Sequence, residues 1–446
     1  MMTRPPAGHA PEAGGARTLH LSELLRRPLA DSGGEPVGRL ADVIVRLRGA
    51  ECPPVIGLVA AVGGRQVFVP AGQVVSLDGE VLRLASARID LRRFERREGE
   101  VLLRADMLGH RLIDVETAHL VRAADLELES RDGQWVLAGV DTRRRPRRLL
   151  GLLGPRRQAP GQDADEPGGQ VFRDWSRFEP LIGHAGSAVT RGPFGRVRRL
   201  KPAQIADLIE DASKEEETEI LGQVHADPEL EADVFEELDE DRATRLLGAR
   251  TDAEVAEVLS RMRADDAADA IAELPQRRRQ QVLDLLPAGQ RTKVLTLMGF
   301  NPASAGGLMG LEFLALPPDR PVAEALAAVG GAHALQPEAL TSVHAVDEGG
   351  LLLGVASVVR LLQSDPAASL AEACDDDPVR IGPDTDMVDV AVLMSDYNLI
   401  TIPVVDEGRR LVGVVTVDDV LEAALPGDWR RRGAAQPPDA HHGEGP

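Results

Sequence analysis

A duplication near the C-terminus limits the fold of this chain more than any other sequence feature. Residues 345–360 read AVDEGGLLLGVASVVR and residues 404–419 read VVDEGRRLVGVVTVDD, with apolar and turn residues in the same order. Around these stretches, residues 309–425 show two cycles of strand, helix, strand, strand and helix. A repeated supersecondary unit buries its apolar face against its copy, so the duplication predicts a pseudo-symmetric pair of small α/β units.

A second repeat occupies the middle of the chain. Apolar residues recur there with a strict period of twelve, at Leu247, Leu259, Ile271, Leu283 and Leu295. Because twelve residues make about 3.3 helical turns, one long helix would rotate these anchors away from a common face. Turn and capping residues interrupt the pattern at Thr251–Asp252, Ala264–Asp265, Pro275 and Pro287. The repeat therefore predicts a superhelix of short stacked helices over residues 200–305.

The N-terminal region has the pattern of short β-strands. Between residues 36 and 90, short apolar runs alternate with Gly, Pro and Asp, which is typical of small barrels and sandwiches. The theme returns over residues 101–141, where Met107–Asp114 echoes Pro36–Asp42 and Trp135–Val140 echoes Val55–Ala60. We therefore expect two small β-barrels in tandem over residues 18–150, in a chain that is multidomain α+β as a whole.

Charge divides the chain into two halves. The net charge is −21, but residues 1–200 carry 31 Lys and Arg against 25 Asp and Glu, whereas residues 201–446 carry 20 against 47. Such an acidic chain repels nucleic acid and anionic membranes, so we expect neither as a partner. The acidic half is either a solubilising surface or a surface that repels itself until cations bind, and composition leaves both interpretations open.

Other segments lack the apolar residues that a packed core needs. Residues 151–170 predict a linker, residues 171–199 a connecting segment, and residues 426–446 a disordered tail. No apolar stretch approaches the roughly 20 residues that cross a bilayer, and the N-terminus lacks the apolar part of a secretory signal. We therefore expect a cytoplasmic protein without membrane insertion.

Catalytic motifs are missing from the sequence. It contains no GxSxG, Walker A or HExxH pattern. Cys52 and Cys374 are far apart in the sequence and lack the spacing of metal ligands. We expect a protein that is not an enzyme and has no catalytic residues.

Two aspartates in the helical repeat are candidate metal ligands. Asp265 and Asp269 are four residues apart, so a helix places them one turn from each other on the same side. Their like charges repel, and a hydrated Mg²⁺ ion, which proteins often hold by one or two carboxylates, would relieve that repulsion. The alternative is that Asp265 and Asp266 favour the positive helix N-terminus while Asp269 is solvated.

The duplicated pair resembles a tandem CBS-domain module, a family that commonly binds adenine nucleotides. The resemblance implies that Gly413, Thr416 and Asp419 form a nucleotide site in the second repeat, with the hydroxyl at a phosphate and the carboxylate at the ribose. Thr416 and Asp419 equally have the spacing of a helix capping box. In the first repeat, Arg360 stands where the family has the ribose-binding aspartate.

The N-terminal strands resemble PRC-barrel domains. The resemblance rests on Gly38-Arg-Leu-Ala-Asp42 and Gly109-His-Arg-Leu-Ile-Asp114 and covers about residues 18–150. It carries no catalytic motif. It implies a module that binds other macromolecules.

Residues 200–425 resemble the cytosolic part of MgtE-type magnesium transporters. The features that carry this resemblance are the acidic helical repeat, the link Ser304–Met309 and the CBS pair that follows it. In that family, Mg²⁺ ions between the N domain and the CBS pair hold a compact state. The ligands implied here are Asp265 and Asp269 in the helical domain, with Asp396, Asp419 and Glu422 on the CBS side.

The sequence departs from the MgtE pattern at two places. Asn398 replaces the second acid expected in the motif Met394-Ser-Asp-Tyr-Asn398, which predicts a weaker metal site on the CBS side. No membrane domain follows Leu425, so we expect no transport by this chain alone.

These observations favour a cytoplasmic regulatory protein that senses Mg²⁺ through acidic surfaces of the helical and CBS domains. Adenine nucleotide, such as ATP, is a second candidate ligand. The CBS resemblance implies a homodimer, and a membrane ion transporter is the candidate partner. The alternative is an adaptor that senses no metal and binds a membrane transporter or a ribosomal component through its PRC-barrel-like domains.

Overall fold

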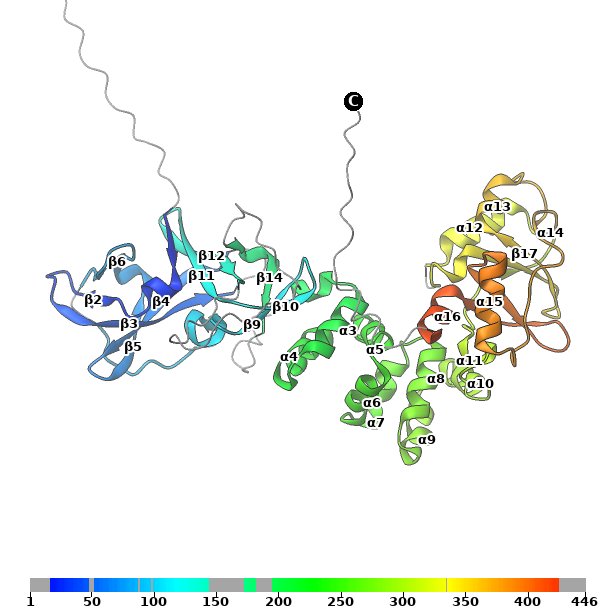
Figure 1. Cartoon of the computed structure of the whole chain (residues 1–446), viewed down its shortest axis with the longest axis horizontal. Coiled ribbons are helices and arrows are strands. Elements are labelled where there is room, and N and C mark those ends of the chain that lie inside the picture. Colours follow the sequence, from blue (N-terminus) through cyan, green and yellow to red (C-terminus); the bar gives the residue numbers. More distant parts are fainter. Residues whose placement is uncertain are drawn as a thin grey trace, which may run out of the picture. The chain divides into compact units, whose positions relative to one another are not determined.

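The computed structural model describes residues 17–47, 52–86, 89–97, 99–143, 172–181, 195–333 and 335–424 (Figure 1). The chain divides into two compact units, residues 1–234 and residues 235–446. The predicted linker over residues 151–170 and the predicted tail over residues 426–446 lie outside the described residues. Within the described ranges, no helix combines the length and the apolar character needed to cross a bilayer.

The first unit contains a seven-stranded sheet. Its strands lie in the order β5-β4-β3-β2-β7-β6, with β8 paired to β3. Neighbours are antiparallel except β2 and β7, which run parallel. The strand bounds are Pro28–Ala30 (β2), Pro36–Arg46 (β3), Val55–Val62 (β4), Arg65–Pro70 (β5), Val74–Ser76 (β6), Leu82–Leu84 (β7) and Glu100–Leu102 (β8).

Two smaller antiparallel sheets complete the strand-rich part. Their orders are β1-β11-β12-β13 and β10-β9-β14. The bounds are Thr18–His20 (β1), Arg111–Asp114 (β9), His119–Arg122 (β10), Asp125–Arg131 (β11), Gln134–Asp141 (β12), Arg173–Asp174 (β13) and Phe178–Pro180 (β14). The predicted strand-rich region is confirmed. The expected barrels are not seen as closed structures, because β5 and β6, the end strands of the large sheet, do not pair with each other in the described part of the chain.

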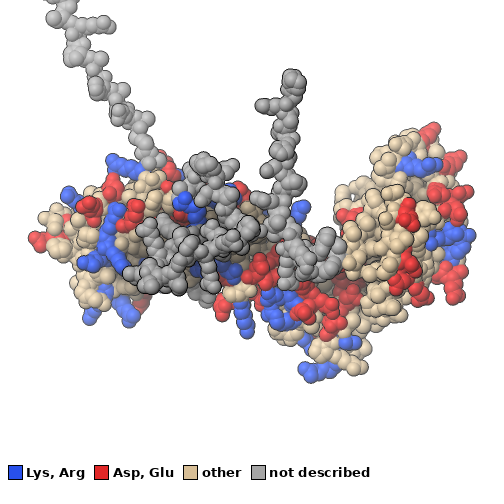
Figure 2. Space-filling model, viewed as in Figure 1, with Lys and Arg blue, Asp and Glu red and all other residues tan. Residues whose placement is uncertain are grey.

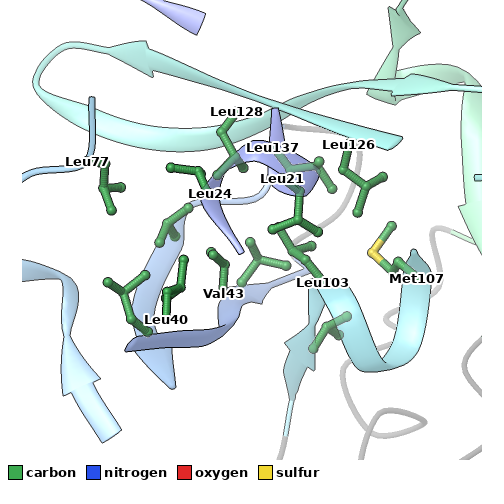
Figure 3. Packing of buried hydrophobic residues seen from close by; sticks show 14 of the residues in the cluster. Leu21, Leu24, Leu40, Val43, Leu77, Leu103, Met107, Leu126, Leu128 and Leu137 are labelled. Carbon is green, nitrogen blue, oxygen red and sulfur yellow. The ribbon is translucent and has the colours of Figure 1, made fainter. Parts of the chain in front are cut away.

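One hydrophobic core spans the two predicted barrels (Figure 3). Val43 of β3 and Leu128 of β11, which belong to the first and the second predicted barrel, lie in the same cluster of buried side chains. Trp175, from the segment predicted to be a connection, is 1% exposed in that cluster. Burial of such large apolar side chains contributes about 1.5 to 3 kcal/mol each. A shared hydrophobic core therefore holds together both predicted barrels and the segment that follows them.

Helices complete the first unit. Arg111 of β9 forms an ion pair with Glu216 of α4, and its guanidinium also donates to the carbonyl of Asp211 in α3 at 3.3 Å. These contacts connect the helices to the strands. The helical bounds are Leu21–Leu24 (α1), Ala71–Gln73 (η1), Leu103–Met107 (η2), Trp175–Arg177 (η3), Arg196–Arg199 (η4), Pro202–Asp211 (α3), Lys214–Val224 (α4) and Pro228–Glu236 (α5), the last of which crosses into the second unit.

Whereas α3, α4 and most of α5 lie in the first unit, the second unit contains the rest of the helical repeat predicted over residues 200–305. Its helices are Glu240–Gly248 (α6), Asp252–Leu259 (α7), Ala264–Glu273 (α8), Gln276–Leu285 (α9) and Ala288–Leu297 (α10). Short helices therefore restart at the predicted turns. The Thr251 hydroxyl accepts from the N–H of Glu254 at 3.3 Å, and the Glu254 carboxylate accepts from the N–H of Thr251 at 2.8 Å, so this pair forms a capping box.

The prediction that Leu295 is a buried anchor of the repeat is wrong. Four anchors are buried, but Leu295 is 53% exposed. Val294 and Leu297 are buried in α10 instead. These two residues are three apart and share the inward face, whereas Leu295 lies about 100° around the helix from Val294.

The predicted CBS pair is confirmed as two repeats of one topology. In the first repeat, β15 pairs in parallel with β16, which pairs antiparallel with β17. In the second repeat, Ile381 forms a parallel bridge with Val404 of β18, which pairs antiparallel with β19. The bounds are Ala315–Leu316 (β15), Val322–Gly331 (α12), Ala339–Thr341 (η5), Ser342–Val346 (β16), Leu352–Ser357 (β17), Val358–Gln363 (α13), Leu370–Ala373 (α14), Met387–Tyr397 (α15), Thr401–Val405 (β18), Leu411–Thr416 (β19) and Val417–Ala424 (α16).

A short helix, α11 (Ala305–Leu308), connects the helical repeat to the CBS pair. The N–H groups of Ala305 and Gly306 donate to the carbonyls of Thr385 and Pro383, both at 2.8 Å. A Cβ at Gly306 would lie 2.6 Å from the ring of Phe300, so glycine permits the close approach. The link therefore packs directly against the second CBS repeat.

Candidate functional site

Arg263 connects the helical repeat to the second CBS repeat. It stands at the N-cap of α8, where Nε lies 2.6 Å from Oδ2 of Asp266 and Nη1 lies 3.0 Å from Oδ1 of Asp419 in α16. Its backbone N–H donates to Oε1 of Glu236, the last residue of α5, at 2.6 Å. One arginine therefore contacts carboxylates from three helices.

Gln336, from the first CBS repeat, also contacts the guanidinium of Arg263. In the amide orientation that satisfies both groups, its side-chain oxygen accepts from Nε of Arg263 at 3.2 Å and from Nη1 at 3.1 Å. The side chain of Arg263 is 23% exposed and that of Asp419 is 10% exposed. Because the pair is partly withdrawn from water, salt screens it less than it screens a surface pair.

Four carboxylates act on the charge of Arg263, those of Asp266, Asp265, Asp419 and Glu236. Burial raises the pKa of Asp265 to about 6; Arg263 opposes this shift and the charge of Asp419 adds to it. Burial and then the charge of Asp265 raise the pKa of Asp266 well above its usual value. Burial also raises the pKa of Asp419, against the hydrogen bond from Thr416 and the charge of Arg263. Carboxylates with raised pKa values take up a proton or a cation more readily than exposed ones.

Four of the five predicted metal ligands lie on the two helices that Arg263 joins. Asp265 and Asp269 are on α8, and Asp419 and Glu422 are on α16. The charge of Glu422 contributes to the raised pKa of Asp266, so Glu422 acts on the same place. We call these four residues and Asp266 the acidic cluster.

The fifth predicted ligand is separate from the acidic cluster. Asp396 is exposed in the last turn of α15, and no hydrogen bond or ion pair between described residues connects it to the cluster. Asn398, two positions later, caps α15 in the left-handed conformation with φ of 52°, which asparagine adopts more readily than most residues. The departure from the MgtE motif at Asn398 therefore has a local structural reason. The metal role of all five residues stays a prediction.

The predicted nucleotide ligands lie where β19 leads into α16, with Gly413 and Thr416 in the strand and Asp419 in the first turn of the helix. The Thr416 hydroxyl donates to Oδ2 of Asp419 at 2.6 Å, so both oxygens of this carboxylate have partners. Packing explains the glycine at position 413, because a Cβ there would lie 2.5 Å from Sδ of Met309. In the first repeat, the Ser357 hydroxyl instead accepts from the N–H of Arg360 at 3.2 Å and caps α13.

The donor chemistry of the acidic cluster suits a hard cation. Mg²⁺ prefers carboxylate oxygens and usually keeps several of its waters, so one or two carboxylates suffice. No group of three or more His, Cys, Asp or Glu side chains in the described ranges is placed to hold a metal ion directly. Asp and Glu side chains are also prominent on the visible surface of the short helices (Figure 2). The cluster therefore fits a hydrated ion held by pairs of carboxylates, beside the positive charge of Arg263.

Sequence reasoning missed Arg263, Glu236 and Gln336 as members of the site. Arg263 directly precedes Ala264-Asp-Asp at a predicted helix start, and that neighbourhood of acids was the available signal. Glu236 and Gln336 have no such signal, because they reach Arg263 only through tertiary packing.

Two known families match the second half of the chain. The MgtE intracellular N domain matches residues 200–303, and the CBS domain matches residues 370–426. The predictions of an MgtE-type helical domain and a CBS pair are thereby confirmed. The PRC-barrel resemblance of the N-terminal strands stays a prediction.

Curated relatives and solved structures also match part of the chain. The magnesium transporter MgtE of Thermus thermophilus is 39% identical over 186 residues, which is 40% of this chain and 41% of that protein. The magnesium transporter MgtE of Enterococcus faecalis is 28% identical over 130 residues, which is 29% of this chain and 28% of that protein. The chain thus spans less than half the length of these relatives.

Among solved structures, the cytosolic domain of the Mg²⁺ channel MgtE in complex with ATP is 31% identical. The alignment covers 51% of the present chain and 92% of the MgtE structure, with a TM-score of 0.48. The two family matches thus make residues 200–303 similar to the MgtE intracellular N domain and residues 370–426 similar to a CBS domain.

Proposed function

We propose that this chain is a regulatory protein that senses Mg²⁺ through the acidic cluster. The observation that carries the proposal is that three partly buried carboxylates, those of Asp265, Asp266 and Asp419, surround the guanidinium of Arg263 where an MgtE-type N domain meets a CBS pair. The relatives named above are magnesium transporters, which makes Mg²⁺ the candidate ion.

Sensing would follow from the repulsion between α8 and α16. A cation held through water by Asp265 and Asp269, with Asp419 and Glu422 from the other helix, would reduce that repulsion. An ion that binds the close arrangement more tightly than the open one shifts the population toward the close arrangement. The chain would pass this change to a separate partner in the cytoplasm, and we propose a membrane ion transporter.

Adenine nucleotide is the second ligand that we propose. Thr416 and Asp419 lie together at the start of α16, as a nucleotide site of the CBS type requires, and the ATP complex described above is a structure of a related protein. We also propose a homodimer through the CBS pair. It is supported by apolar side chains on the helices of that pair, where Val359, Leu362, Val388 and Val392 are 51% to 68% exposed.

Calorimetric titration of the full chain with MgCl₂ tests the proposal. We expect heat of binding in the wild type and an affinity lowered roughly tenfold in Asp265→Asn/Asp269→Asn, because two carboxylates next to the ion are lost. The matched control is Asp376→Asn/Asp377→Asn, an exposed acidic pair outside the cluster, which should bind as the wild type does. No binding by the wild type, or equal affinity in all three proteins, would rule the proposal out.

A further inference from the structure

The contacts of Arg263 connect distant parts of the second unit without any metal. Arg263 and Asp419 are 156 positions apart in the sequence. Glu236 from α5 and Gln336 from the first CBS repeat contact the same arginine. All of these are direct hydrogen bonds or ion pairs, so the helical repeat is joined to both CBS repeats by one side chain.

We propose that the guanidinium of Arg263 is the cation that occupies the acidic cluster in the absence of metal. Its guanidinium holds α8 on α16 when no metal is bound, and it competes with a divalent cation for Asp419. The first half of this proposal stands on the contacts alone. The second half rests on the proposed function.

A surface pair in the same unit shows why burial matters for the first half. Arg320, two residues before α12, and Glu324 on α12 also form an Nη1 to carboxylate contact of 3.0 Å, but their side chains are 54% and 56% exposed. Such an exposed pair contributes little, because water and salt screen it. Removal of Arg263 would instead leave Asp419 and Asp266 partly buried without their counter-charge, which is the costly way to break an ion pair.

Competition follows from the hydrogen bonds of Asp419. Oδ1 faces Arg263 and Oδ2 accepts from Thr416. A cation that binds this carboxylate must therefore displace the guanidinium or share the carboxylate with it. Two positive charges at one carboxylate repel each other. Arg263 therefore weakens divalent-cation binding at Asp419 and takes over its structural role when the ion is absent.

Hydrogen–deuterium exchange of the full chain in EDTA tests the first half. In Arg263→Gln we expect peptides from residues 264–273 and 417–424 to exchange roughly tenfold faster than in the wild type, because the joined helices separate more often. Arg320→Gln, the matched surface change, should exchange as the wild type does, and Arg263→Lys should be intermediate. Peptides from α6 and α7 should not change. Equal exchange in wild type and Arg263→Gln, or an acceleration spread evenly over α6 and α7, would overturn the proposal.

Titration of the same proteins with MgCl₂ tests the second half. We expect Arg263→Gln to bind Mg²⁺ roughly tenfold more tightly than the wild type, because a positive charge beside the site is removed. Unchanged or weaker binding would overturn the competition. If exchange in EDTA responds as expected while no protein binds Mg²⁺, then the proposed function and the competition both fail and the metal-free role of Arg263 stands.

Discussion

Carboxylates in the two units of this protein have different kinds of surroundings. In the first unit, two buried carboxylates each have their own partners: Asp42 accepts from three backbone N–H groups at 2.7 to 3.0 Å, and Asp114 pairs with Arg173 and Arg177 at 3.3 and 3.4 Å. In the second unit, Asp266 and Asp419 of the acidic cluster have side chains that are 24% and 10% exposed, and they share the guanidinium of Arg263. A buried acid with a complete set of partners is a structural element, whereas acids that share too few partners mark a place where a ligand can bind.

A raised pKa alone does not separate the two cases. Burial raises the pKa of Asp42 to about 6, against its three backbone hydrogen bonds, and burial raises that of Asp265 to the same value. The number and kind of partners is what differs. Four changes, from the largest expected effect to the smallest, test whether the distinction holds.

The loss of Asp114 should have the largest effect. Its side chain is fully buried, and Asp114→Ala leaves Arg173 and Arg177 without their shared carboxylate. We expect the free energy of unfolding of the first unit to fall by about 3 kcal/mol. Urea denaturation followed by tryptophan fluorescence measures this, because Trp135 and Trp175 lie in this unit. A loss below about 1 kcal/mol would contradict a structural role for the acid.

Asp42→Asn should have a smaller effect in the same unit. The carboxylate oxygens accept from the N–H groups of Val43, Arg104 and Ala105, and an amide cannot accept from all of them through both of its atoms. We expect a loss of about 1 to 2 kcal/mol, the cost of one buried donor without a partner. The same urea experiment measures it, and an unchanged midpoint would show that these bonds are dispensable.

Acid should stabilise the second unit when metal is absent. The pKa of Asp265 is raised from 3.8 to about 6 in the folded protein, so its proton favours the folded state. That contribution is complete below the unfolded value and is lost as the pH rises through about 6. We expect the second unit in EDTA to lose about 1 kcal/mol of stability between roughly pH 5 and pH 7.

Thermal unfolding at the two pH values measures this dependence, and Asp265→Asn is the matched variant. It should be the more stable protein near neutral pH and should show a flatter pH dependence. A second unit that gains stability on going from acid to neutral pH would reverse the expected sign and contradict the raised pKa of Asp265.

The smallest effect is expected at the surface. Arg320→Gln removes an exposed pair with Glu324 and should change the free energy of unfolding of the second unit by less than about 0.5 kcal/mol. Thermal unfolding of this variant beside Arg263→Gln measures the difference. If the two variants lose the same stability, burial does not distinguish the two arginines.

Local patterns predicted most of the second unit. The turns of the helical repeat, the Thr251 capping box and the duplication of the CBS pair all follow from residues a few positions apart, and the structure and the family matches agree with them. The error at Leu295 has the same origin, because a period in the sequence does not say which of two adjacent apolar residues a neighbouring helix covers.

The N-terminal region was harder to predict. Alternating apolar runs identified strands, but closure of a barrel depends on which strands pair at the edges, and pairing is a contact between distant residues. The common core that includes Trp175 also joins segments that the echoes in the sequence separate. Strand content was therefore predictable and sheet connectivity was not.

Residue order alone determined where helices start, where the chain repeats itself and which half is acidic, because these properties depend on near neighbours and on composition. Three-dimensional packing decided that Arg263 meets Asp419 across 156 positions and that Glu236 and Gln336 join them. The physical reason is that a charge inside a folded protein is stabilised or destabilised by whatever lies within a few ångströms of it, and that neighbourhood exists only after the helical repeat and the CBS pair have packed together.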